Sequence, residues 1–420
     1  MKDSKIEWTK HTFNPIRGCV RISPGCRRCY AEAMSGRNPA QLGIWGPFGT
    51  RPTAGESYWR QLARWNAEAA LAGERAPVFC ASLADLGEGE PGVERAPYEE
   101  RMAAALEVGT DDAVSEVDAW AALFESRDGP RATHLLVLER LAAETASLPW
   151  LPLLILTKRP WNLLRWAERR GAWPATWALG VTIESAHQLG RWHEAVKIPA
   201  PMRFWSVEPQ VGPLRPATHL LVYEDAADGQ WRPRQDAAAQ ECRRRRLLPD
   251  WIIQGGESGG GARPLHPGWA RELRDMAAAA GVPYLFKQWG ESEPMSPALT
   301  YMEGVDGARN GEQSDRAHWR EFSAGVLVIQ ADGRVEVPKA PFEAWWQQQE
   351  PEWQADEEVV DAWDVPDAWP AETAALAREG GVPWAMHRVG KKVAGRALDH
   401  VEHNGRPAFL TDREPIRGAA

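Results

Sequence analysis

Seven short, strand-like segments constrain the fold of this chain more than any other feature. The first alternates polar and apolar residues, and the other six are continuous apolar runs; they are residues 6–13, 77–82, 151–156, 177–183, 202–207, 250–254 and 282–286. Short strands that alternate with helical stretches are typical of parallel βα units. The sequence therefore predicts an α/β protein with a full or partial (β/α) TIM-like barrel, carrying insertions and a C-terminal extension.

Charged residues follow six of these segments. They are Asp85, Lys158 with Arg159, Glu184, Glu208, Glu257 and Lys287. The carboxyl ends of all strands in such a barrel lie on one face, which carries the chemistry. Polar loops alone would explain any one of these charges, but their succession predicts a single site at the barrel mouth.

Three of the five cysteines lie within eleven residues, as Cys19, Cys26 and Cys29, with the spacing C-x6-C-x2-C. Gly18 and Gly25 favour turns, so we expect the thiols on a tight loop. Three thiolates on one loop indicate a soft-metal centre.

The spacing leaves three interpretations of the cysteine loop open. A structural zinc ion needs a fourth protein ligand, and the nearest candidates, His11 and Cys80, lack the usual spacing. A cubane iron–sulfur cluster held by three thiolates would leave one iron free for a small molecule. The third interpretation is a set of plain buried thiols.

Composition limits the class of protein and the partners. No segment approaches the roughly 18 consecutive apolar residues of a membrane-spanning helix, so no membrane partner is expected. The N-terminus has no apolar signal core, and the odd number of cysteines, mostly clustered, favours a reducing cytoplasm. A net charge of −9 gives no overall attraction to nucleic acid, so only local basic runs such as Arg243–Arg246 could bind phosphates.

The chain divides into two predicted regions. Residues 1–291 form the barrel, with insertions near 88–147 and 215–249. Residues 292–420 form an extension, for which three interpretations stay open: a lid over the barrel mouth, a partner-binding region or a partly disordered segment. It contains a hairpin over residues 324–338, with Asp332-Gly333 at the turn, and ends in a basic element at 388–399.

Several motifs together resemble a phage-associated family of unknown function, known from phage gene products 37 and 68. The matching stretches are Glu7–Thr9, Gly18–Cys19, Ser23–Cys26, Cys29–Glu32, Leu156–Pro160, Leu179–Glu184, Ser206–Pro209, Gly255–Gly259, Phe286–Gly290 and Gly390–Asp399. That family in turn resembles radical S-adenosylmethionine proteins through its three cysteines. The first cysteine interval here is three residues longer than in the commonest radical motif, C-x3-C-x2-C.

The resemblance implies a [4Fe-4S] cluster on Cys19, Cys26 and Cys29, with S-adenosylmethionine as the second cofactor. The cluster would need an external reductant, and zinc is the alternative metal. Cofactor-binding candidates are Gly255, Gly256 and Glu257, which resemble a Gly-Gly-Glu element that binds the cofactor's amino group, together with Glu184 and Tyr30. A plain glycine turn between strand and helix would also explain the Gly-Gly pair.

The catalytic candidates are Lys158, Glu208 and Lys287. Lys158 and the adjacent Arg159 offer fixed positive charge to a carboxylate or phosphate. Glu184 and Glu208 could bind ribose hydroxyls or the cofactor's amine. Salt bridges among these charges are the alternative interpretation.

The sequence thus predicts a radical S-adenosylmethionine-type enzyme that makes a 5′-deoxyadenosyl radical and modifies or repairs an unidentified substrate, with a nucleotide or nucleic-acid base as the suggested class. The alternative is a non-catalytic barrel, stabilised by zinc or a cluster, that binds nucleic acid or a protein. A nucleotide hydrolase built on Glu184, Glu208 and Glu257 is a third hypothesis, which the cysteine loop disfavours.

Overall fold

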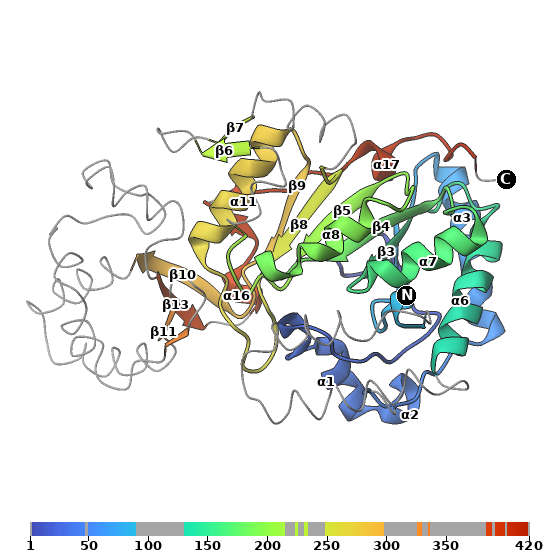
Figure 1. Ribbon diagram of the computed structural model, residues 1–420, viewed down its shortest axis with the longest axis horizontal. Helices are drawn as coiled ribbons and strands as arrows, with labels where there is room; N and C mark the ends of the chain where they lie inside the picture. The colour runs from blue at the N-terminus through green and yellow to red at the C-terminus, as the bar shows by residue number, and fades with distance from the viewer. Residues whose placement is uncertain are drawn as a thin grey trace, which may run out of the picture. The chain divides into compact units, whose positions relative to one another are not determined.

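The computed structural model describes residues 2–46, 49–89, 130–214, 223–225, 231–233, 248–297, 326–329, 335–336, 384–388, 391–399 and 401–418. Its main sheet has seven strands in the order β1-β2-β3-β4-β5-β8-β9 (Figure 1). The strands are β1 (His11–Phe13), β2 (Val78–Cys80), β3 (Leu153–Thr157), β4 (Trp177–Thr182), β5 (Arg203–Val207), β8 (Trp251–Gly255) and β9 (Tyr284–Gln288). Strands β1 to β5 pair in parallel. The predicted α/β class is confirmed, and the sheet is consistent with a partial barrel.

The central strands are buried because both faces of a parallel sheet are covered. Every residue of β4 and β5 is buried. At Gly180 a Cβ would lie 2.2 Å from the Phe204 ring, so the absence of a side chain on β4 lets the aromatic ring of β5 pack there. The predicted strand over residues 6–13 is shorter than expected and comprises only β1.

Helices on the chain between the strands begin and end at residues suited to those positions. Helix α7 (Pro160–Arg170) has proline in its first turn, where no intrahelical hydrogen bond is lost, and ends at the left-handed Gly171. Helix α3 (Glu56–Ala72) likewise ends at the left-handed Gly73. Helix α8 (Gly190–Ala195) lies with α7 in front of β3, β4 and β5 in Figure 1. Helices α6 (Pro130–Thr145) and α11 (Pro267–Ala280) precede β3 and β9.

Tryptophan side chains fill part of this core. Trp166 on α7 stacks on Trp177 of β4 at 5.5 Å between ring centroids, and Trp173 meets both rings edge-on. The Trp177 indole nitrogen donates to Thr145, so its polar atom is satisfied although the ring is buried.

A second sheet has the order β10-β13-β11-β12. It contains β10 (Ser292–Pro297), β11 (Val326–Ile329), β12 (Val335–Glu336) and β13 (Trp384–Arg388). Strands β11 and β12 pair antiparallel, which confirms the predicted hairpin, while its turn lies outside the described residues. Strands β10 and β13 were not predicted, because β10 is a polar, proline-containing segment.

The chain forms two compact units. The first contains residues 1–207, 244–253 and 405–420, and the second contains residues 208–243 and 254–404. Most of the two predicted insertions, and the Arg243–Arg246 run, lie outside the described residues. None of the helices in the described ranges is long and apolar enough to cross a membrane.

Candidate functional site

The three clustered cysteines share one loop of the first unit, between β1 and α1 (Tyr30–Arg37). Cys26 ends a single turn of 3-10 helix that starts at Pro24, and Cys29 caps the N-terminus of α1. All three are free thiols and are partly exposed. The predicted tight loop is therefore confirmed.

Two glycines let this loop approach its neighbours closely. Gly18 has φ of 95°, a left-handed conformation that favours glycine, and a Cβ there would lie 2.7 Å from the Thr50 carbonyl oxygen. At Gly25 a Cβ would lie 2.5 Å from a carboxylate oxygen of Glu184. The loop backbone thus rests directly on the residue that follows β4.

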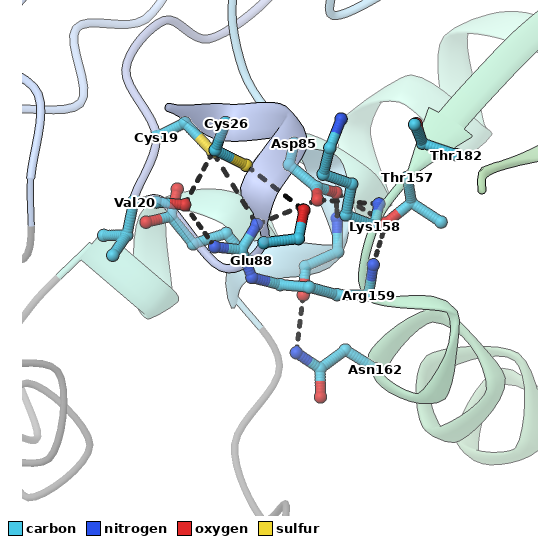
Figure 2. Close-up of polar contacts among 12 residues, drawn as sticks. Cys19, Val20, Cys26, Asp85, Glu88, Thr157, Lys158, Arg159, Asn162 and Thr182 are labelled. Carbon is cyan, nitrogen blue, oxygen red and sulfur yellow. Dashed lines mark hydrogen bonds and ion pairs between the residues drawn. The ribbon is translucent and has the colours of Figure 1, made fainter. Parts of the chain in front are cut away.

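Arg159, which follows β3, anchors the first half of the loop (Figure 2). It is 1% exposed. Its Nη2 donates to the Val20 carbonyl at 2.7 Å, and its Nη1 lies 3.6 Å from Cys19 Sγ and 2.8 Å from Asp85 Oδ2. Asp85 also accepts from the Thr157 hydroxyl at 2.6 Å and from the Lys158 backbone at 3.0 Å. Burial opposes ionisation of Asp85, but Arg159 and these donors outweigh it and lower its pKa.

Glu184 anchors the second half of the loop. Its fully buried carboxylate accepts from Ser23 Oγ at 2.5 Å and from Arg191 Nη1 at 2.7 Å. Burial alone would raise the pKa of Glu184, but Arg191, Lys158 and Ser23 lower it below its usual value. Glu184 is therefore an ionised group that holds the loop against β4 and α8.

Lys158 is the more accessible cation of the Lys158-Arg159 pair. Its side chain is 22% exposed, and its Nζ lies 3.9 Å from Glu184. Burial would lower the pKa of Lys158, but the neighbouring Cys26 thiol and Glu184 raise it overall. Lys158 thus places a positive charge beside the cysteines while Arg159 is committed to the loop.

The donor set can be compared with the two metals that the sequence suggests. Among the residues that the structure places, no three His, Cys, Asp or Glu side chains come close enough to hold one metal ion. A tetrahedral zinc site draws its ligands around a single ion, whereas each cysteine of a cubane cluster binds a different iron, which separates the sulfurs further. Burial raises the pKa of the Cys19 and Cys29 thiols, whereas Arg159 beside Cys19 and Lys158 beside Cys29 oppose that rise and favour the thiolates that a cluster would need as ligands.

The two suggested fourth zinc ligands, His11 and Cys80, are buried in strands β1 and β2. The His11 ring stacks on Trp65 at 4.4 Å, and its Nδ1 accepts from the Asp3 backbone. Burial lowers the pKa of His11 to about 4, so the ring is neutral. Cys80 is fully buried in β2, as its apolar surroundings in the sequence predict.

Glu208 and Lys287 form an ion pair in the second unit. Lys287 Nζ lies 2.5 Å from Glu208 Oε1, with side chains 14% and 18% exposed. Gln288 donates to the same oxygen at 3.4 Å. A Cβ on Gly255 would lie 3.5 Å from the Glu208 carboxyl carbon, which places Gly255 beside this pair.

Gly256 and Glu257 have structural partners of their own. A Cβ at Gly256 would lie 1.9 Å from the Trp289 carbonyl oxygen, so close backbone packing requires glycine there. Both Glu257 oxygens accept from Arg263, at 2.6 Å from Nη2 and 2.9 Å from Nε. Binding of a cofactor amine by Glu257 stays a prediction, and this carboxylate already faces a guanidinium.

Tyr30, the remaining cofactor-binding candidate, begins α1 with its side chain half exposed. Its hydroxyl donates to the Ser82 carbonyl at 2.9 Å. This contact ties the start of α1 to the loop after β2.

The structure brings Lys158, Glu184 and the three cysteines together in the first unit. It brings Glu208, Lys287 and Gly255 together in the second. A single site that includes all of them stays a prediction. The sequence placed Asp85 at a strand end without a role, and it suggested Arg159 as a charge for a carboxylate or phosphate, whereas Arg159 binds Asp85 and the Val20 carbonyl. It missed Arg191 because an arginine inside a helix carries no distinguishing signal.

No curated protein matches this sequence. A family model described as a protein of unknown function, DUF5131, matches residues 3–105 and 130–407. The match spans the cysteine loop, all seven strands of the main sheet and the residues around Glu208 and Lys287. The chain belongs to the DUF5131 family.

Proposed function

We propose that this protein is a radical S-adenosylmethionine-type iron–sulfur enzyme. The observation that carries the proposal is the cysteine loop: three thiols on one loop, fastened at both halves by the buried Arg159 and Glu184 side chains. The resemblance of the motif to radical S-adenosylmethionine proteins supports it further. Cys19, Cys26 and Cys29 would hold a [4Fe-4S] cluster, leaving one iron for S-adenosylmethionine.

When bound, these two cofactors would supply a 5′-deoxyadenosyl radical that abstracts hydrogen from the substrate. The residues of the chain would bind and orient the cofactors and the substrate. Lys158 balances thiolate charge beside Cys26, and Glu184 fixes the loop. In the second unit, Glu208 and Lys287 offer an acceptor and a donor that are both partly exposed, and Gly255 leaves room beside them.

The finer parts of the proposal rest on resemblance. They are a phage association and a reductant that feeds the cluster. The strand pattern suggests a TIM-like form of the partial barrel, and the cysteine usage suggests a cytoplasmic location. A nucleotide or nucleic-acid base is the substrate class that the resemblance favours.

A specific observation favours the alternative, a non-catalytic module stabilised by zinc or a cluster. Four carboxylates at the strand ends face a cation of the same chain, as Asp85–Arg159, Glu184–Arg191, Glu208–Lys287 and Glu257–Arg263. Such pairing is what a scaffold needs, because a buried charge without a partner is costly.

Anaerobic reconstitution with iron and sulfide distinguishes the radical enzyme from the non-catalytic module. After reduction, we expect a cubane electron paramagnetic resonance signal that changes when S-adenosylmethionine is added, and 5′-deoxyadenosine in the quenched mixture. The Cys26→Ala variant should lose both. A protein that holds one zinc ion and takes up no cluster would refute the enzyme proposal and favour the module.

A further inference from the structure

Arg159 touches the cysteine loop at a sulfur atom as well as at the backbone. Its Nη1 lies 3.6 Å from Cys19 Sγ, within reach of a hydrogen bond to sulfur, while its Nη2 holds the Val20 carbonyl at 2.7 Å. Figure 2 shows the guanidinium between the loop and Asp85. Only 1% of the Arg159 side chain is exposed.

The environment makes this contact electrostatically strong. Arg159 and Asp85 are both buried, at 1% and 8% side-chain exposure, so water screens neither charge well. Arg159 Nη1 lies near both Cys19 Sγ and Asp85 Oδ2. The positive charge at the sulfur is therefore moderated by the negative charge of Asp85.

Hydrogen bonds to ligand sulfurs and nearby net charge set the reduction potentials of iron–sulfur clusters. A cation beside a ligand sulfur stabilises the reduced cluster, which carries one more negative charge, and a carboxylate destabilises it. We propose that the Arg159–Asp85 pair sets the reduction potential of the cluster bound through Cys19, Arg159 raising it and Asp85 lowering it. This inference rests on the proposed function.

The geometry distinguishes this role from substrate binding. Arg159 is enclosed by loop and strand, whereas its neighbour Lys158 is 22% exposed. Arg159 is thus a positioning and tuning residue, and Lys158 is the cation that a ligand could reach.

The test measures the midpoint potential of the reconstituted cluster by dithionite titration followed with electron paramagnetic resonance, without S-adenosylmethionine. Arg159→Met removes the cation and should make the potential more negative, changing the reduced-to-oxidised ratio at a fixed potential about tenfold, or about 59 mV for one electron. Asp85→Asn removes the carboxylate with little change of shape and should shift the potential in the opposite direction.

A matched control is Arg170→Met, which removes a cation from a surface pair with Glu139 and should leave the potential unchanged. Shifts of opposite sign support the inference, because a loosened loop would not reverse sign between the two variants. If Arg159→Met does not fold, the comparison of Asp85→Asn with Arg159→Lys replaces it as the test. Arg159→Lys keeps the positive charge and should shift the potential less than Asp85→Asn does.

Two negative outcomes are distinguishable. If the wild-type protein binds a cluster whose potential is unchanged in these variants, or shifts the same way in Arg159→Met and Asp85→Asn, the tuning role is wrong and the proposed function stands. If the wild-type protein takes up no cluster, the proposed function fails and the tuning role fails with it.

Discussion

The two units each place a carboxylate–cation pair after a strand of the main sheet, and the two pairs differ in burial. Glu184 and Arg191 in the first unit are 0% and 7% exposed, and Glu184 also binds Ser23 of the cysteine loop. Glu208 and Lys287 in the second unit are 18% and 14% exposed. A buried pair with further protein partners is suited to holding a loop, whereas a partly exposed pair could exchange its partner for a ligand. The same residue types at strand ends therefore differ in burial and in their further partners.

The largest expected effect comes from removing the buried carboxylate of the Glu184–Arg191 pair. Glu184→Ala leaves Arg191 buried without its carboxylate, which should lower the free energy of unfolding by about 3–5 kcal/mol. Glu208→Ala at the more open pair should cost about 1 kcal/mol or less. Urea unfolding of both variants, together with their iron content after reconstitution, measures the contrast. Equal losses of unfolding free energy would mean that the two pairs have the same structural role.

A second prediction concerns the adjacent glycines of the second unit. Gly256→Ala forces a Cβ to within 1.9 Å of the Trp289 carbonyl, and overpacking of this kind should cost about 3 kcal/mol. Gly255→Ala is the matched control, because its Cβ would meet Gln288 and Glu208 at an ordinary 3.5 Å. Thermal or urea unfolding compares them. A tolerated Gly256→Ala would show that backbone packing does not require glycine there. Cofactor binding at Gly256 stays a prediction.

The buried character of the first unit should also appear in its pH dependence. Burial lowers the pKa of His11 to about 4 from 6.5, so the unfolded chain binds a proton more readily than the folded chain between these values. Stability from His11 is complete above pH 6.5 and declines as the pH falls, by about 2 kcal/mol between pH 8 and pH 5. The His11→Phe variant keeps a ring on Trp65 but cannot titrate. Its unfolding free energy should decline less than that of the wild type, and identical pH profiles would contradict the assignment.

The smallest expected effect tests whether the Tyr30 hydroxyl belongs to the cysteine site. Tyr30→Phe removes a hydrogen bond to Ser82 at a half-exposed position, which should cost about 0.5 kcal/mol. Iron uptake after reconstitution should be unchanged. A loss of iron or of the response to S-adenosylmethionine would instead make the Tyr30 hydroxyl part of the binding site.

The elements of the main sheet were predictable because local patterns specify them. Apolar runs such as residues 177–183 and 202–207 became β4 and β5 within one residue at their ends, and the proline at position 160 marked the start of α7. Strands β10 and β13 were missed because their residues have no alternating pattern and pair only with distant partners.

Sequence alone determined that three thiols share one tight loop and that charges follow successive strands, because spacing and turn residues are properties of neighbouring positions. Only the tertiary structure decided what each charge does. Arg159 and Lys158 are adjacent in sequence, yet Arg159 is buried against Cys19 and Lys158 is partly exposed. Arg191 meets Glu184, and Asp85 meets Arg159, across different elements of the first unit. Burial and pairing between elements distant in sequence set the energy of a charge, and no local pattern records them.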